Sequence, residues 1–201
     1  MVDLASISAE KITCVRGGRV VFRDVNFHVE AGQPLIVEGA NGSGKTSLLR
    51  MLAGLLSTAA GEIRVNECAS NGEERSELVG WLGHQEAAKP QLTPRETLRF
   101  FVQLYGSAAH ADDALARVGL DRAADLPCQY LSAGQKKRLA LARLLGLGRP
   151  LWLMDEPFAS LDAEGRMLAT EFARAHASAG GIVVIASHDP IELPCERLRL
   201  S

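Results

Sequence analysis

The sequence predicts an α/β fold, and three observations carry that prediction. Continuous apolar runs at residues 34–39, 151–156 and 181–189 each end in glycine or polar residues, as parallel strands buried on both faces do. Residues 25–30 instead alternate apolar and polar side chains, the period of two of a half-buried strand. Between residues 93 and 120 the pattern changes to one typical of helices.

The helical segment begins with a recognisable start signal. Thr93 and Glu96 have the spacing of a capping box, with Pro94 at the first helical position. The amphipathic stretch 97–106 follows, and a second helix is expected at 111–120. This segment is interpreted as a small helical insertion between two parts of an α/β core.

Length and composition indicate one globular domain. The chain has 201 residues, of which 47% are hydrophobic and 23% charged, so it can bury a substantial core. We predict a single domain over residues 1–201, containing a helical subdomain at about 88–147. The net charge of -2 offers no electrostatic footprint for nucleic acid, so we expect no nucleic-acid partner.

Membrane and secretion signals are not found in the sequence. No apolar run approaches the roughly 18 to 20 residues that span a bilayer, and the first residues lack the pattern of a signal peptide. We therefore expect a cytoplasmic chain. The four cysteines are widely scattered and favour reduced thiols over disulfides or a metal site; they are Cys14, Cys68, Cys128 and Cys195.

A phosphate-binding loop lies at "GANGSGKT", residues 39–46. It fits G-x-x-x-x-G-K-[ST] and stands between a predicted strand and a predicted helix, a context that disfavours a mere glycine-rich turn. Lys45 would reach the β- and γ-phosphates, and Thr46 would offer its hydroxyl to Mg²⁺. The predicted nucleotide-binding residues are Gly39, Asn41, Gly42, Ser43, Gly44, Lys45, Thr46 and Ser47.

Two adjacent carboxylates end the apolar run "LWLMDE". Adjacent strand residues point to opposite sides, so Asp155 and Glu156 should have different roles. We expect Asp155 to hold Mg²⁺ beside Thr46, and Glu156 to polarise an attacking water. His188 ends the next apolar run; it could contact the γ-phosphate or orient the same water, although a lone strand-end histidine is usually structural.

A second helix start lies at "LSAGQKKRLALARLL", residues 131–145. Ser132 can cap the helix, and Gln135 stands three residues later, as a capping box requires. The free N–H groups of the first helical turn can bind an anion. The sequence thus predicts a second phosphate clamp, far along the chain from the first.

Taken in order, the phosphate loop, "LSAGQ", "LMDEPFASLD" and "SHD" resemble the motifs of ABC-type ATPases, the nucleotide-binding domains of transporters. The resemblance covers nearly the whole chain. It implies a P-loop NTPase fold of the ABC ATPase type, with a mixed-sheet core, an antiparallel β subdomain and a small inserted helical subdomain. The implied cofactors are ATP and Mg²⁺.

Site roles also follow from this resemblance. It implies that Gln85 is the Q-loop glutamine, which approaches Mg²⁺ and the attacking water, and that His188 is the switch histidine. The catalytic set is then Glu156, His188 and Gln85, and the metal set is Thr46, Gln85 and Asp155. The signature motif is Leu131, Ser132, Ala133, Gly134 and Gln135, and the D-loop is Ser160, Leu161 and Asp162. In this family two domains pair head to tail, so the signature of one faces the ATP of the other.

A narrower resemblance is to the ATP-binding subunits of heme exporters in cytochrome c maturation. It rests on the segments "WLGHQ", "LTPRETLRFF", "DLPCQYLSAGQKKRLALARL", "LWLMDEPFASLD" and "GGIVVIASH". Ala133, in place of the commoner second signature glycine, and His84 before Gln85 add to it. The implied partners are a second copy of the chain, an integral membrane subunit that is CcmB-like, and associated maturation proteins. The implied place is the cytoplasmic face of the inner membrane, with membrane contact through the partner.

Some points depart from the family pattern or stay open. Many members stack an aromatic ring on adenine where this sequence has Arg16, and a guanidinium can also stack on a base. Other cargoes, such as lipid or peptide, remain alternatives to heme. A nucleotide-gated structural ATPase is remote, because no long coiled coil separates the phosphate loop from the signature. Aromatic residues at Phe100, Phe101 and Tyr105 suggest that the region 85–105 docks the membrane subunit.

Overall fold

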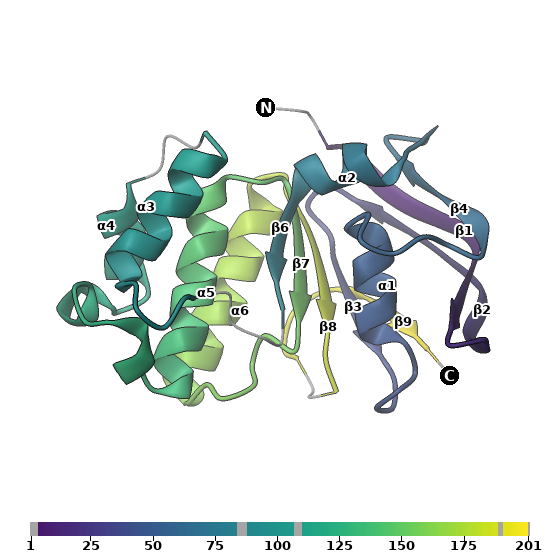
Figure 1. Ribbon diagram of the computed structural model, residues 1–201. Helices are drawn as coiled ribbons and strands as arrows, with labels where there is room; N and C mark the ends of the chain where they lie inside the picture. The colour runs from purple at the N-terminus through teal and green to yellow at the C-terminus, as the bar shows by residue number, and fades with distance from the viewer. Residues whose placement is uncertain (1–3, 84–87, 107–109, 189–190, 201) are drawn as a thin grey trace.

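The computed structural model describes residues 4–83, 88–106, 110–188 and 191–200, and within them the strands form two sheets (Figure 1). The parallel sheet has the order β6 (Val79–Leu82), β7 (Leu151–Asp155), β8 (Ile182–Ala186), β3 (Pro34–Glu38) and β9 (Glu196–Arg199). The antiparallel sheet has the order β2 (Arg19–Glu30), β1 (Ser6–Arg16), β4 (Ala60–Val65) and β5 (Cys68–Ala69).

The helices separate into two groups around the parallel sheet (Figure 1). Helix α1 lies on the side of the antiparallel sheet, whereas α3 to α6 gather on the opposite side. The helices are α1 (Lys45–Leu52), α2 (Gly72–Leu78), α3 (Pro94–Leu104), α4 (Ala111–Arg117), α5 (Ala133–Leu147) and α6 (Ala163–Ser178). Two short 3-10 turns, Asp121–Ala123 and Cys128–Tyr130, connect α4 to α5.

The central strands are buried on both faces, as their continuous apolar runs predicted. In β7, Trp152 and Met154 pack into the cluster formed with α5 and α6. Leu151 and Leu153 point the other way, into the cluster shared with α1 and the antiparallel sheet. The alternation of side chains along an extended strand therefore joins two cores through one sheet.

The predicted α/β architecture is confirmed, with one difference in the arrangement of strands. We expected a mixed core sheet, but every pairing described in the five-stranded sheet is parallel. The antiparallel pairings lie in the separate four-stranded sheet. The connection from β7 to β8 runs through α6, a helical crossover of the kind that parallel strands require.

The predicted helix starts are confirmed at both capping boxes. The Thr93 side chain accepts a hydrogen bond from the Glu96 amide, and Pro94 occupies the first turn of α3. The Ser132 side chain accepts a hydrogen bond from the Gln135 amide at 3.1 Å. Helices α3 and α4 both pack against α5, the helix that begins after Ser132.

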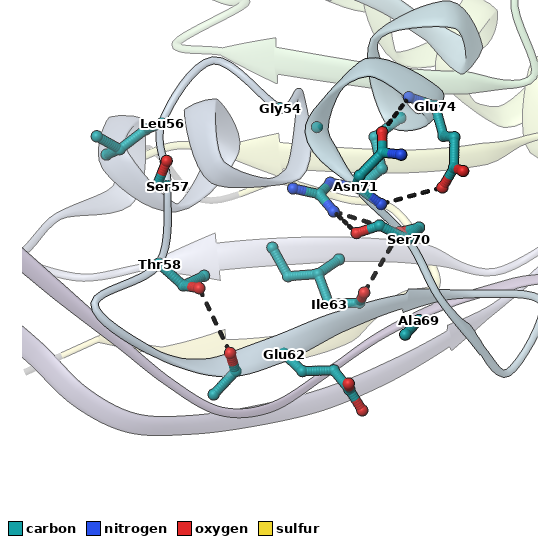
Figure 2. Close-up of a pocket in the computed structure, with 13 residues that line it drawn as sticks. Gly54, Leu56, Ser57, Thr58, Glu62, Ile63, Ala69, Ser70, Asn71 and Glu74 are labelled. Carbon is teal, nitrogen blue, oxygen red and sulfur yellow. Dashed lines mark hydrogen bonds between the residues drawn. The ribbon is translucent and has the colours of Figure 1, made fainter.

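A surface hollow of about 500 Å³ lies between the end of α1 and the β4–β5–α2 segment (Figure 2). The Glu74 amide donates to the Asn71 side chain at 2.9 Å, and the Asn71 amide donates to the Glu74 carboxylate at 3.0 Å. Buried Arg75 donates to the carbonyl oxygens of Ser70 and Met51. These bonds tie α2 to the end of α1, so the polar groups here support the fold.

His176 of α6 is held in a partly buried stack. Its ring lies 4.0 Å from the Trp152 ring between centroids, with an interplanar angle of 8°. Its Nε2 lies 3.0 Å from the carbonyl oxygen of Pro150. Burial lowers the pKa of His176 below its usual value, and the Pro150 hydrogen bond offsets this only in part. The folded protein therefore favours the neutral ring.

This environment predicts a loss of stability on acidification. Below the unfolded pKa of about 6.5, the unfolded chain binds this proton more readily than the folded chain does. The contribution of His176 is thus complete above that pH and is lost as pH falls below it, by at most about 1.4 kcal/mol per pH unit. Urea unfolding at pH 7.5 and 5.5 measures the drop in the free energy of unfolding between these two pH values. That drop should be smaller in His176→Phe than in wild type, because phenylalanine keeps the ring stacked on Trp152 but cannot be protonated. An equal loss in both proteins would contradict the prediction.

Within the described ranges, no helix has both the length and the apolar character that crossing a bilayer requires. Helices α5 and α6, the longest two, are interrupted by charged and polar side chains.

Candidate functional site

The phosphate loop joins β3 to α1 and packs tightly against strand β2. Gly44 has a φ of 100° and stands at the N-cap of α1 without a side-chain cap. A Cβ atom there would lie 2.7 Å from side-chain atoms of both Val21 and Phe22, so glycine is required by conformation and by space. The first-turn N–H groups of α1 are left available to an anion.

Lys45 is the first residue of α1, and its side chain folds back along the loop. Its Nζ donates to the carbonyl oxygens of Gly39 at 2.8 Å and Ala40 at 3.2 Å. An ammonium group has three donors, so one remains for a phosphate oxygen. The residue is buried, which strengthens its interaction with a bound anion.

Thr46 and Asp155 meet at the foot of the loop, although 109 positions separate them. The Thr46 hydroxyl lies 3.1 and 2.9 Å from the two carboxylate oxygens of Asp155. Asp155 is buried, with 3% of its surface exposed, at the end of β7. Two hard oxygen donors therefore converge at one point, a set that fits Mg²⁺, which takes few protein ligands together with phosphates and water.

Glu156 leaves the strand through an unusual backbone conformation. Its φ is 47°, in the left-handed region that non-glycine residues seldom adopt. Its amide donates to the carbonyl oxygen of Ala186 at 2.9 Å, which fixes this turn against β8. The sequence analysis predicted that Asp155 and Glu156 point to opposite sides because they are adjacent on a strand. In the structure the left-handed backbone at Glu156 also turns the chain away from the strand.

His188 lies beside Glu156 at the carboxyl end of the neighbouring strand. Its Nδ1 is 2.9 Å from the Glu156 Oε2. Both groups follow adjacent parallel strands, β7 and β8, where ligands of open α/β sheets collect. The histidine is exposed, and the acid is partly exposed, so both can reach a solvent molecule or a bound ligand.

The phosphate loop, Asp155 and Glu156 line a cavity of about 510 Å³. The phosphate loop and the acid pair form one end, and the β1–β2 hairpin forms the other. The lining residues are Arg16, Val21, Asn41, Gly42, Gly44, Lys45, Thr46, Ser47, Asp155 and Glu156. Val21 was not anticipated from the sequence, because its place over the loop depends on how the hairpin packs.

The helix start that the sequence predicts to be a second phosphate clamp lies at the beginning of α5. The Ser132 amide donates to the Gln135 side chain at 2.9 Å, which completes the capping box. The first intrahelical bond runs from the Lys136 amide to the Ser132 carbonyl oxygen. The amides of Ala133 and Gly134 precede that bond, and helix geometry leaves them without an intrahelical acceptor.

Arg138, which sequence reasoning missed, links α5 to the D-loop. Its Nη2 donates to Asp162 Oδ1 at 3.1 Å and lies 3.5 Å from Glu164. The Gly165 amide donates to the same Asp162 carboxylate at 2.8 Å. The pKa of Asp162 is lowered, first by the Gly165 amide and then by Arg138. The basic residues 136–138 after the signature were the available signal in the sequence. That signal did not identify Asp162 as the partner of Arg138.

The signature and D-loop residues line a separate hollow of about 540 Å³. Its walls include Ser132, Gly134, Gln135, Ser160 and Asp162. It shares no described lining residue with the cavity at the phosphate loop. The described residues therefore form two separate clefts, each beside the start of a helix.

Not every predicted site residue lies at a cleft wall. Leu131 and Leu161 are buried in the core, where they support the signature and the D-loop. The Gly39 carbonyl accepts a bond from Lys45, and the Ser43 hydroxyl is buried within the loop. The predicted Q-loop residue Gln85 lies outside the described residues.

Comparison with known proteins places these features in a wider context. The family model described as ABC transporter matches residues 22–159. A protein of Nitrobacter winogradskyi named cytochrome c biogenesis ATP-binding export protein CcmA is 44% identical over 195 residues, covering 96% of this chain and 97% of its own.

Two solved structures share the fold. A putative ABC transporter ATP-binding protein from Pyrococcus furiosus has a TM-score of 0.86 at 22% identity, and 98% of each chain is covered. An ATP-binding cassette solved as a dimer in a post-hydrolysis state, bound to ADP and phosphate, has a TM-score of 0.79 at 24% identity. That comparison covers 91% of this chain and 88% of the other.

Proposed function

The chain belongs to the ABC transporter family and, within it, to the CcmA group of ATP-binding export proteins, and from this premise we propose its function. It hydrolyses ATP to power a membrane complex that exports heme for cytochrome c biogenesis. Similarity over nearly the full length of the relatives supports this assignment. Heme is the cargo of the complex, and this chain supplies the energy at the cytoplasmic face of the inner membrane.

The two separate clefts carry the mechanistic part of the proposal. Each lies beside a helix start, where first-turn amides lack an intrahelical acceptor, yet they share no described lining residue. An ATP held by the phosphate loop would need a second molecule to bring a signature helix to its γ-phosphate. A head-to-tail homodimer supplies that arrangement twice, and the dimeric post-hydrolysis cassette of the same fold agrees with it.

In this mechanism the side chains divide into binding and proton-handling groups. Lys45 binds the β- and γ-phosphate oxygens with its remaining donor. Thr46 and Asp155 would hold Mg²⁺ with Gln85, and the ion would neutralise charge on the phosphates. Glu156 orients a water molecule and accepts its proton at the carboxylate. His188, hydrogen-bonded to that carboxylate, keeps it aimed at the water.

Hydrolysis then changes how strongly the two chains hold together. The γ-phosphate lies between one phosphate loop and the partner's signature helix, so both chains bind the same group. Its removal weakens the interface, which gives two states that differ in affinity between the chains. A membrane partner that senses the spacing of the two chains can convert this change into transport.

The membrane partner is proposed to be a CcmB-like integral subunit. Purification of the chain together with that subunit in lipid nanodiscs tests the assignment. ATPase activity stimulated by heme, but not by lipid or peptide, is the expected result. Stimulation by a lipid or a peptide instead would assign a different cargo to the same energy-supplying chain.

A surface for that partner is proposed on α3. Phe100 and Leu104 of α3, with Tyr105 at its C-cap, form the exposed apolar surface of α3, with exposed fractions of 55%, 60% and 44%. Phe100 and Leu104 are four residues apart on one face of the helix. Behind them, the Arg143 guanidinium lies 4.8 Å from the centroid of the Phe101 ring. An exposed apolar patch of this kind supports an interaction site.

The double variant Phe100→Ser/Leu104→Ser is expected to lose the membrane subunit. Both side chains are exposed, so folding should change by less than about 0.5 kcal/mol, while capture of the subunit falls at least about tenfold. Co-purification and heme-stimulated ATPase activity measure the effect. Leu55→Ser, at an apolar position with 67% exposure away from α3, is the control. Assembly and coupling equal to wild type in the double variant would contradict this surface.

A further inference from the structure

Helix α5 lies between α3 and the edge strand β6 and contacts both (Figure 1). One of its side chains, Arg143, reaches both neighbours at once. Its guanidinium lies 4.8 Å from the centroid of the Phe101 ring of α3, and its Nη2 donates to the carbonyl oxygen of Trp81 in β6 at 3.0 Å. We call this path from Phe101 through Arg143 to Trp81 the Arg143 link.

The contacts of Arg143 are directional, unlike those of an aliphatic core residue. The side chain is partly buried, and burial lowers the pKa of its guanidinium below the usual value, so a cation at this position costs free energy. Among the described residues no carboxylate lies within ion-pair distance of Arg143, whereas Arg95 and Arg138 are each paired with acids. A planar guanidinium can contact a ring face and donate to a carbonyl at the same time. The link therefore sets both the distance and the orientation between α3 and β6.

The outer end of the Arg143 link lies behind the surface that is proposed to bind the membrane subunit. The Phe100 and Phe101 rings meet edge to face, with centroids 5.4 Å apart and an interplanar angle of 76°. Phe101 also stacks on Tyr105, with centroids 6.4 Å apart and an angle of 10°. Phe100 and Tyr105 are both exposed. A partner bound to them would therefore contact the two rings that touch Phe101.

The inner end of the link reaches the strand beside the two acids of the nucleotide cavity. Trp81 pairs in register with Leu153 of β7, two residues before Asp155. Asp155 and Glu156 line that cavity. Rigid elements joined by hydrogen bonds and packed side chains can carry coupling between distant sites. A change in the position of β6 can thus reach the acids through the ladder between β6 and β7.

We propose that Arg143 is a positioning residue, which couples binding of the membrane subunit at α3 to the placement of Asp155 and Glu156. This rests on the proposed function and adds how the partner regulates the ATP site. Without a partner, Asp155 keeps its contact with Thr46. The Glu156 amide likewise keeps its bond to the Ala186 carbonyl oxygen. Arg143 therefore governs the response to the membrane subunit, whereas basal hydrolysis does not depend on it.

A second arginine beside the same rings provides a matched control. The Arg149 guanidinium lies 5.0 Å from the centroid of the Tyr105 ring and donates to the carbonyl oxygen of Glu77. Glu77 belongs to α2, before β6 begins, whereas Trp81 stands in the second half of β6. Arg149 thus makes the same kinds of contact but leads to the end of β6 that is farther from the acids. Its loss should leave the response to the membrane subunit unchanged.

The test compares the ATPase activity of the isolated chain with that of the complex assembled with the membrane subunit in lipid nanodiscs. Arg143→Met keeps much of the side-chain length but loses the guanidinium plane and the bond to Trp81. We expect basal activity within about twofold of wild type and unchanged co-purification of the subunit. The change of activity on assembly should shrink at least about fivefold. Arg149→Met should keep the wild-type response.

Phe101→Leu removes the same link from the side of α3, and it carries the test should Arg143→Met fail to fold. It should show the same loss of response. The double variant Phe101→Leu/Arg143→Met should lose no more than either single variant, because each change breaks one shared link.

Three results would contradict these expectations, and they fall on different claims. A wild-type response in a folded Arg143→Met protein, or in Phe101→Leu, would overturn the inference. An equal loss of response in Arg149→Met would also overturn it, because the arginines would then serve only the fold. Unchanged activity of the wild-type chain on assembly with the subunit would overturn the proposed function itself.

Discussion

Replacement of Glu156 by glutamine is expected to lower steady-state ATP hydrolysis at least about 100-fold while leaving ATP binding intact. The carboxylate lies at the mouth of the cavity beside His188, where it can take a proton from water. Glutamine keeps the size and the hydrogen-bonding oxygen but cannot accept that proton. Binding persists because Lys45 and the amides of the phosphate loop are unchanged.

Two measurements follow the Glu156→Gln variant. Steady-state phosphate release gives the loss of turnover, and size-exclusion chromatography with ATP and Mg²⁺ should show a dimer that persists. Glu171→Gln, at an exposed position on α6, controls for the change of charge and should behave as wild type. Turnover at the normal rate in Glu156→Gln would remove this carboxylate from the role of general base.

The second large effect is expected from Gly134→Asp in the signature helix. Gly134 lines the second hollow and precedes the first intrahelical hydrogen bond of α5. A carboxylate at this position would repel the γ-phosphate of the partner's ATP, whereas a negative charge near a helix start is itself favourable to the helix. ATPase activity should fall at least about 100-fold, because the new carboxylate counteracts the helix-start amides that would stabilise negative charge on the γ-phosphate in the transition state.

A steric control separates charge from crowding at this position. A Cβ on Gly134 would lie 3.1 Å from the Ser160 carbonyl oxygen, so any side chain crowds the D-loop slightly. Gly134→Ala introduces the crowding without the charge and should retain most of the activity. Binding of ADP to the phosphate loop, measured by calorimetry, should be equal in both variants and wild type. Equal losses in Gly134→Ala and Gly134→Asp would contradict the role of charge.

The elements that sequence analysis predicted best are those with local signals. The apolar runs of β3, β7 and β8 and the capping boxes at Thr93 and Ser132 depend on neighbours in the chain. Strand β9 was not anticipated, because Glu196–Arg199 is short, largely polar and mostly exposed. It forms only by pairing with β3 at the sheet edge, a contact that no local pattern announces.

The candidate site was likewise predictable where its residues follow local sequence signals, and not where they depend on tertiary packing. Thr46 and Asp155 could be brought together from the sequence because parallel strands end at one edge of a sheet. The contact of Arg138 with Asp162, the place of Val21 over the loop and the left-handed backbone of Glu156 depend on tertiary packing. These features could not be predicted from the sequence, because each depends on how separate elements pack together and leaves no local pattern in the chain.

The central claim is that each ATP site is shared between two copies of the chain. Chains carrying Lys45→Ala and chains carrying Gly134→Asp are expected to be inactive on their own. In their mixed dimer one site collects both substitutions, and the other pairs an intact phosphate loop with an intact signature. The two kinds of chain can carry different affinity tags, so that the mixed dimer is isolated and its composition verified.

ATPase activity of that verified mixed dimer tests the shared site most directly. The shared-site account predicts clear hydrolysis by the mixed dimer, in the presence of ATP and Mg²⁺, from two chains that are each inactive alone. Mixed dimers as inactive as both parents would contradict a site that works independently once its two halves, Lys45 and Gly134, are intact.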